Sequence, residues 1–164
     1  MDVVGITHTL AAASALLLGP SVFVRKKGTA LHKKLGYGYV FSMLVLNATA
    51  LMIYDLFQGW GIFHYLSALS LLTLLSGFVP AYLKRPANWI EWHYMGMTWS
   101  YVGLTAAAVA ETLTRTPLYW PAITEIIPGH FFWNAVGVGT FVVCGAGWYL
   151  INKRKLGYPG RNPA

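Results

Sequence analysis

The chain is short of charged residues and has a single cysteine. Only 10% of its 164 residues are charged, whereas a soluble protein averages about 25%. A chain with so little charge cannot cover a surface that faces water, which excludes an ordinary soluble domain. Because Cys144 is the only cysteine, an intrachain disulfide is excluded as well.

Several motifs of common catalytic and cofactor sites are also missing. The sequence contains no HExxH zinc motif, no glycine-rich phosphate loop and no CxxCH motif for covalent haem. A haem bound by this chain is therefore expected to be b-type and non-covalent. The net charge of +7 does not indicate nucleic acid, because the basic residues form short clusters between long apolar runs rather than one continuous face.

Long apolar runs dominate the sequence. Hydrophobic residues make up 56% of the chain, and a membrane-spanning helix needs about 20 mostly apolar residues. Backbone groups in hydrocarbon must pair within their own segment, so these runs are predicted to be helices. We predict an all-α integral membrane bundle of five transmembrane helices, which form a single domain over residues 1–164. The predicted helices span 3–24, 37–57, 62–83, 93–113 and 131–151.

The basic residues orient the predicted bundle. Eleven of the twelve lysines and arginines fall on the side shared by the 25–34 and 84–85 connections and the C-terminal tail. Arg115 alone falls on the other side. Since basic residues are enriched on the cytoplasmic side of membrane proteins, the pattern predicts an outside N-terminus and a cytoplasmic C-terminus.

All five histidines lie near the ends of predicted helices. His32 and His93 are on the predicted inner side, whereas His8, His64 and His130 are on the outer side. A crossing of about 20 residues is about 30 Å long, so inner and outer histidines cannot share one site. The histidines are therefore expected to form two separate groups or none.

The alternation of histidines along the chain indicates a ligand pattern. His32, His64, His93 and His130 fall on four successive helices and alternate between the two sides. Helices 2 and 4 can pair His32 with His93, and helices 3 and 5 can pair His64 with His130. Two facing imidazoles are what bis-histidine ligation of a haem iron requires.

A second pattern favours a metal site near the outer face. His8, His64 and His130 come from three helices, with Glu111 or Asp55 available as a fourth group. Three protein ligands and one water are typical of catalytic zinc. The alternative is a purely structural role. In that case the histidines, like the interfacial tryptophans, anchor helix ends in the membrane interface.

One face of the fourth predicted helix carries polar groups at both ends. His93 and Glu111 are five full turns apart, and Met97, Ser100 and Leu104 lie on or near the same face. We expect this stripe to face the interior of the bundle. The alternative is that Met97 and Leu104 belong to a simple core and Glu111 caps the outer end.

Two asparagines, Asn47 and Asn134, lie within or near predicted spans and are expected to form interhelical hydrogen bonds rather than bind a metal. The longest connection, 113–130, contains three prolines and is expected to be an ordered or semi-rigid cap.

Four windows resemble the core of the ascorbate-reducible two-haem transmembrane cytochromes b: "LHKKLGYGYV", "FHYLSALSLL", "EWHYMGMTWSYVG" and "GHFFWNAVGVG". This resemblance implies four core helices whose histidines ligate one haem near each membrane face. The stretches "LHKKLGYGY" and "HYMGMTWSYVGLTAAAVAE" are similar to a family of small bacterial membrane proteins of unknown function. That family implies a bundle of four to five spans in the bacterial inner membrane, without an assigned activity.

Three functions remain as hypotheses. The first is a membrane-embedded b-type haem protein that carries electrons within or across the bilayer. The second is a zinc-binding or other metal-binding membrane enzyme, and the third is an accessory subunit with structural histidines. The expected partners are the lipid bilayer and, for the first hypothesis, a redox partner. Assembly into a larger complex or a homo-oligomer is left open by the sequence.

Overall fold

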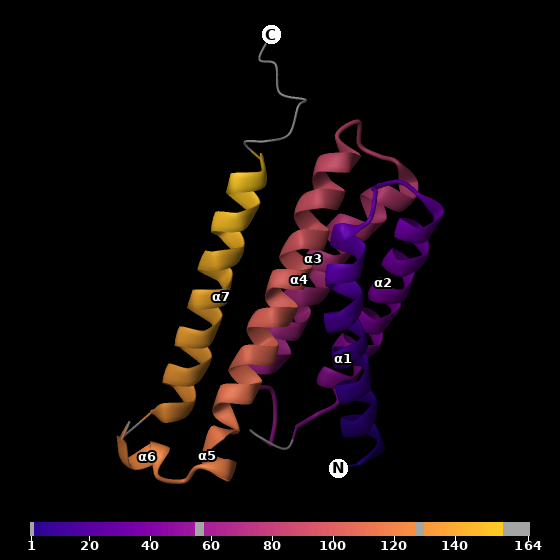
Figure 1. The fold of residues 1–164 in the computed structure, drawn as a ribbon. Coiled ribbons are helices and arrows are strands. Elements are labelled where there is room, and N and C mark those ends of the chain that lie inside the picture. Colours follow the sequence, from indigo (N-terminus) through magenta and orange to yellow (C-terminus); the bar gives the residue numbers. More distant parts are fainter. Residues whose placement is uncertain (1, 55–57, 127–129, 156–164) are drawn as a thin grey trace. The chain divides into compact units, whose positions relative to one another are not determined.

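The computed structural model describes residues 2–54, 58–126 and 130–155, without the side chains of 125–126 and 154–155. The described residues form an all-helical protein with five long helices and two short ones, and they contain no strand (Figure 1). The long helices are α1 (Val3–Val24), α2 (Ala30–Ala50), α3 (Ile62–Leu83), α4 (Trp89–Thr114) and α7 (Phe131–Lys155), and the short ones are α5 (Thr116–Tyr119) and α6 (Ile123–Ile126).

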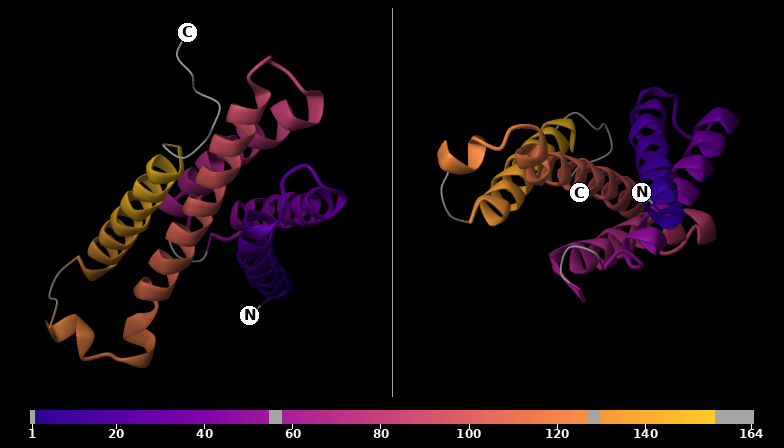
Figure 2. Two further views of the ribbon diagram at one scale, coloured as in Figure 1. Left: turned by 45° about the horizontal axis from the view of Figure 1, so that its top comes forward. Right: turned by 90° about the horizontal axis from the view of Figure 1, so that it is seen from below.

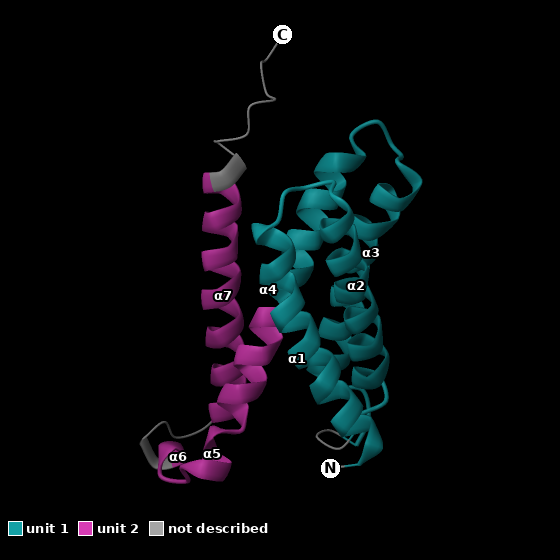
Figure 3. Cartoon of the chain, turned by 45° about the vertical axis from the view of Figure 1, so that its right-hand side comes forward, with its two compact units in different colours: residues 1–104 teal, residues 105–164 magenta. Residues whose placement is uncertain are grey.

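The chain divides into two compact units, and the division falls within α4 (Figure 3). Unit 1 comprises Met1–Leu104 and unit 2 comprises Thr105–Ala164. Each unit is described by itself below. The single helical domain expected from the sequence therefore stays a prediction.

Three of the described helices are long and apolar enough to cross a membrane, namely α1, α3 and α7. Helix α2, with 21 residues, and α4, with 26 residues, have the necessary length but are less apolar. Lysines at the start of α2 and polar aromatic residues in α4 account for this difference. Five spans and the direction of the termini stay predictions.

The ends of α1 and α3 fall at the predicted residues, whereas α2 is shifted toward the N-terminus. The prediction of 37–57 missed seven helical residues, 30–36, because the helix begins at Ala30. Thr29 explains this start, since its Oγ1 accepts a hydrogen bond of 3.2 Å from the backbone N–H of His32. His32 is consequently helical rather than part of a loop, and the helix already ends at Ala50.

The longest connection between spans is partly helical. Helices α5 and α6 both lie within 113–130, and Pro117 occupies the first turn of α5. The prediction of an ordered connection is confirmed for these two short helices. Residues 127–129 of the same connection lie outside the described residues.

The interior of unit 1 contains a layer of apolar side chains, which we call the apolar layer. Helices α1 and α2 lie side by side in unit 1, and the views in Figures 1 and 2 agree on this. Met43 on α2 and Leu74 on α3 have no exposed surface at the centre of the layer. Ser100 and Leu104 are buried too, so the middle of the predicted stripe of α4 faces inward in unit 1. The layer consists of Ala15, Tyr39, Val40, Met43, Leu74 and Leu104.

Helices α3 and α4 touch through glycine. A Cβ atom added to Gly77 would lie 2.5 Å from the backbone nitrogen of Met97, and one added to Gly96 would collide with the backbone of Gly77. Both obstacles are backbone atoms, which cannot rotate away as a side chain can. The two glycines thus allow the close helix approach that small residues provide in membrane proteins.

Two hydrogen-bonded side-chain pairs join helices within unit 1. Ser67 Oγ on α3 donates to Asn47 Oδ1 on α2 at 2.9 Å, and both residues are buried. This confirms the expected interhelical role of Asn47. The second pair, Tyr39 on α2 and Ser100 on α4, has an O···O distance of 2.9 Å. Because Ser100 Oγ also donates to the Met97 carbonyl, the Tyr39 hydroxyl is the donor within this pair.

The Asn47–Ser67 contact gives a first testable prediction. We expect Asn47→Leu and Ser67→Ala each to destabilise the protein, with a coupling of about 0.6–1.7 kcal/mol between them, the range found for interhelical hydrogen bonds in membranes. The measurement is a double-mutant cycle built from the free energies of unfolding of the four proteins in detergent micelles. Ser21→Ala is the matched control, because the Ser21 hydroxyl bonds only to Leu17 of its own helix. Additive effects would show that the contact is energetically neutral.

Candidate functional site

The structure brings two of the predicted ligand histidines together within unit 1. His32 lies in the first turn of α2 and His93 in the second turn of α4. Their ring centroids are 6.3 Å apart, and the ring planes are nearly perpendicular, at 84°. These two residues, called the histidine pair below, are the combination that helices 2 and 4 were predicted to form.

The tautomer of His93 is set by a backbone contact. Its Nδ1 lies 3.0 Å from the carbonyl oxygen of Gly77. A carbonyl only accepts hydrogen bonds, so Nδ1 carries the proton and Nε2 of the neutral ring carries the lone pair. Metal-bound histidines are usually oriented in this way, with one nitrogen held by a carbonyl or carboxylate and the other directed at the metal. The close approach of Gly77 and Gly96 fixes the carbonyl in place.

His32 presents a buried nitrogen without a partner. Its Nδ1 is shielded from solvent and makes no hydrogen bond. Burial, together with the charge of the nearby Lys27 ammonium and with His93, lowers the pKa of His32, which lies ahead of the apolar stretch predicted to begin at residue 37. The ring is therefore neutral near pH 7. A neutral imidazole with an unused lone pair is able to ligate a metal through Nδ1.

The separation of the two rings fits a shared metal. A metal–nitrogen bond of about 2 Å, plus about 1 Å from nitrogen to ring centre, places two imidazole centroids about 6 Å apart across one metal. The observed 6.3 Å agrees with this value. Two imidazoles are the donor set that would hold the iron of a b-type haem.

Basic residues surround the histidine pair. Lys27 Nζ donates to the carbonyl oxygens of Val22 and Phe23 at the end of α1, at 3.1 and 2.9 Å. Lys33 and Lys34 follow His32 directly and are exposed. This end of unit 1 therefore presents positive charge that suits carboxylate groups, including haem propionates.

His64 has the opposite tautomer. The backbone N–H of Gly61 donates to His64 Nδ1 at 3.2 Å. An amide N–H cannot accept, so Nδ1 of the neutral ring is unprotonated and Nε2 carries the proton. His64 is only 3% exposed, and its buried Nε2 makes no hydrogen bond to any residue that the structure describes. A protonated Nε2 does not ligate a metal, so this geometry favours hydrogen-bond donation over ligation.

Two aromatic rings lie against His64. The centroid of Tyr54 is 4.9 Å away with an interplanar angle of 31°, and that of Trp60 is 5.3 Å away with an angle of 30°. Rings stacked at such small angles occupy the space above the imidazole plane. An acceptor for the Nε2 proton therefore has to approach near the plane of the ring.

His130, the proposed partner of His64 in an outer haem site, belongs to unit 2. It directly precedes α7, has a positive φ of 50°, and is exposed. Because the two units are each described by themselves, the pairing of His64 with His130 stays a prediction.

His8 is held by a hydroxyl of the neighbouring helix. Its Nδ1 lies 3.1 Å from Thr49 Oγ1. The hydroxyl of Thr49 directs its own proton to backbone carbonyls of α2, such as that of Val45 at 2.8 Å. Thr49 therefore accepts from His8, and the lone pair of the His8 ring is on Nε2.

The remaining residues of the alternative zinc site are distributed over the chain. Glu111 in unit 2 forms an ion pair with Arg115 at 2.6 Å, which favours the interpretation that it closes its own helix end. Asp55 lies outside the described residues. Among the residues that the structure describes, no three His, Cys, Asp or Glu side chains gather in a metal-binding group. The zinc site therefore stays a prediction.

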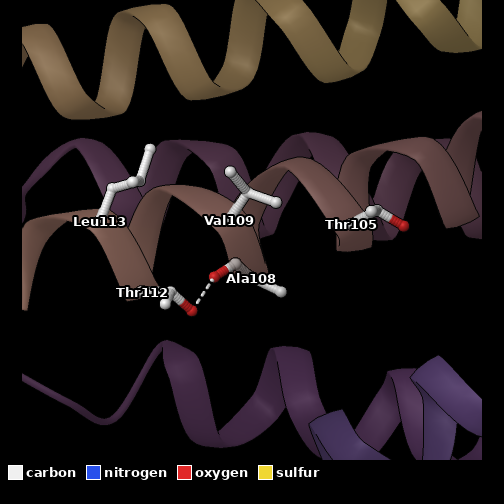
Figure 4. Close-up of a pocket in the computed structure, with 5 residues that line it drawn as sticks. All are labelled: Thr105, Ala108, Val109, Thr112 and Leu113. Atoms are coloured by element: carbon white, nitrogen blue, oxygen red, sulfur yellow. Dashed lines mark hydrogen bonds between the residues drawn. The ribbon is translucent and has the colours of Figure 1, made fainter.

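A groove of about 240 Å³ runs along α4 in unit 2 (Figure 4). The Thr112 hydroxyl at its wall donates to the Ala108 carbonyl at 2.7 Å and is thus already used. None of the predicted site residues lines this groove, which is almost entirely apolar. Its walls are formed by Thr105, Ala108, Val109, Thr112 and Leu113.

Sequence reasoning missed the backbone groups that select the tautomers of these histidines. Gly77 provides the carbonyl for His93, and Gly61 provides the N–H for His64. A glycine three residues before His64 and a helix-interior glycine at 77 are visible in the sequence. The partners of their backbone groups are not visible, because they depend on how the chain folds.

The chain is an all-α membrane protein. Its helices are long and apolar, it carries very little charge, and its histidines lie near helix ends. The family model described as "Predicted membrane protein (DUF2306)" matches residues 5–154, and the chain belongs to this family, whose function is unknown. This confirms the similarity to small membrane proteins of unknown function noted in the sequence. No curated protein and no solved structure matches the chain.

Proposed function

We propose that this protein is a membrane-embedded b-type haem protein that carries electrons, and that His32 and His93 would hold the haem. The observation that carries the proposal is the histidine pair itself. Two imidazoles from different helices have ring centroids 6.3 Å apart; His32 Nδ1 has no hydrogen-bond partner among the described residues, and the His93 ring is oriented by a carbonyl. A structural histidine would normally have its buried nitrogens satisfied.

The chain contributes orientation and exclusion of water. The Gly77 carbonyl keeps the proton of His93 on Nδ1, which leaves Nε2 available as a ligand. Burial and Lys27 keep His32 neutral. A bound haem would supply one-electron redox chemistry, for which the polypeptide needs no acid or base.

The charge around the pair suits contact with a redox partner. Lys33 and Lys34 are exposed at the start of α2, and Arg25 and Lys26 are exposed after α1. Transient redox complexes form through complementary charge, which raises the association rate more than the affinity. The partner surface expected at this end is therefore acidic.

The test of the proposal is the absorption spectrum of the detergent-purified protein, oxidised and then reduced with dithionite, with metal analysis of the same sample. We expect a Soret band and the sharp reduced α and β bands of a six-coordinate b-type haem, at one iron per chain or more. A spectrum without haem bands, after expression with added haem precursor, would overturn the proposal. Zinc at one atom per chain would then support the site at the outer histidines, and the absence of any metal would support an accessory subunit.

A further inference from the structure

The second buried nitrogen without a partner, His64 Nε2, points to a separate ligand. We infer that His64 donates a hydrogen bond from Nε2 to the carbonyl oxygen of a lipid-soluble ligand bound at the Gly61 end of unit 1. The inference does not depend on a haem at the histidine pair, which involves other residues. Its chemistry follows from the tautomer, the burial and the neighbours of this one ring.

The donor character of Nε2 is fixed by the backbone. Gly61 directly precedes α3, and its backbone N–H donates to His64 Nδ1. A proton on Nδ1 would leave that N–H without its acceptor. Only 3% of the surface of His64 is exposed. An unsatisfied buried N–H is destabilising, and native proteins rarely retain such groups unless a ligand or water satisfies them.

A water molecule is a poor candidate for this position. A buried water needs two to four polar partners, about three on average. Among the described residues near this end of unit 1, Ser67 bonds to Asn47, and Thr49 bonds to its own helix and to His8. Aromatic rings of Tyr54 and Trp60 cover much of the remaining surface of the imidazole. One donor in apolar surroundings suits a ligand that offers one oxygen on an apolar body.

The oxygen is expected to be an uncharged carbonyl. Burying an anion would cost far more than one hydrogen bond returns, whereas a carbonyl on a hydrocarbon or ring costs little to transfer from lipid. A bilayer supplies such carbonyls from two sources, namely the ring oxygen of a quinone and the ester group of a phospholipid. A carbonyl from either source is expected to approach near the plane of the imidazole, since the stacked rings of Tyr54 and Trp60 restrict access from above.

Nuclear magnetic resonance of the histidine side chains tests the inference, because the chain has only five histidines. Protein labelled with ¹⁵N-histidine is purified in a maltoside detergent, which has no carbonyl group. It is then titrated with decylubiquinone in one arm and with dimyristoylphosphatidylcholine in the other. We expect the His64 Nε2–H proton to move downfield and become slower to exchange in one arm, which identifies the source of the carbonyl.

Variants of His64 distinguish the contribution of the N–H donor to ligand affinity from that of the ring shape. His64→Phe retains an aromatic ring but lacks the N–H, and we expect it to bind the responding ligand at least tenfold more weakly, as measured by equilibrium dialysis. His64→Gln retains a side-chain N–H and is expected to bind within about threefold of the parent, since the amide restores a neutral donor. His8→Phe is the matched control from the same end of unit 1 and is expected to leave the affinity unchanged.

The inference is overturned if neither ligand moves the His64 resonance, or if His64→Phe binds as tightly as the parent. Thermal unfolding of each variant in the same detergent shows whether a lost affinity reflects a lost fold. His64→Gln serves as the second variant if His64→Phe does not fold. The haem bands are recorded on the same samples, so failure of this inference and failure of the haem proposal are observed separately.

Discussion

Gly96→Ala is expected to abolish most of the folded protein. The added Cβ would collide with the backbone nitrogen and Cα of Gly77, and neither helix can relieve the overlap by turning a side chain. Overpacking in a well-packed interior costs about 1–3 kcal/mol, and a clash of backbone on backbone belongs at or above the upper end of that range. The measurement is the yield of monodisperse protein and its unfolding midpoint in detergent.

Gly103→Ala is the matched control, because Gly103 is on the same helix and a Cβ added there meets no atom within 4 Å. Alanine is favoured over glycine within a helix by about 0.5–1 kcal/mol, so this variant is expected to be at least as stable as the parent. Equal stability of Gly96→Ala and Gly103→Ala would show that α3 and α4 do not pack through their glycines.

His93→Ala is expected to reduce the haem content of the purified protein to less than a tenth of that of the parent. The substitution removes one of two proposed axial ligands, and loss of even a residue that orients a ligand typically costs 10–100-fold in metal affinity. The expectation for His32→Ala is the same. The measurement is the reduced-minus-oxidised spectrum per mole of protein, with circular dichroism to confirm the helical content.

His8→Ala is the control for that experiment. His8 is, like His93, a half-buried histidine whose Nδ1 donates to a neighbouring helix, but it is not part of the histidine pair. We expect His8→Ala to retain the spectrum of the parent. If His64→Ala removed the bands while His93→Ala retained them, the axial ligand would be His64, and both the assignment to the histidine pair and the donor role of His64 would be wrong.

The sequence predicted the helices better than the contacts between them. Two helix ranges, 3–24 and 62–83, agree with the structure because each is a long apolar run bounded by polar or glycine residues. The inward stripe of α4 followed from helical periodicity, and the meeting of His32 with His93 followed from topology. These features depend on local pattern and on the order of the helices.

The parts that were not predicted depend on atoms that come together only in the folded chain. The early start of α2 depends on one hydroxyl, that of Thr29, which outweighs the lysines that follow it. Which nitrogen of His64 or His93 carries the proton depends on whether a backbone N–H or a carbonyl lies opposite. For this reason the sequence suggested the same ligand role for both residues, while the structure favours different roles.

The apolar layer has a consequence for the energetics of the membrane. On α2, Met43 lies between the Tyr39 hydroxyl and Asn47, and on α3, Leu74 lies between Ser67 and Gly77. A proton that moves by hopping needs closely spaced hydrogen-bonding groups or water, and carrying an ion through apolar side chains is costly. Electrons, in contrast, tunnel through such material. We therefore expect the layer to insulate against protons, so that a bundle carrying electrons as proposed would not dissipate the ion gradient of its membrane.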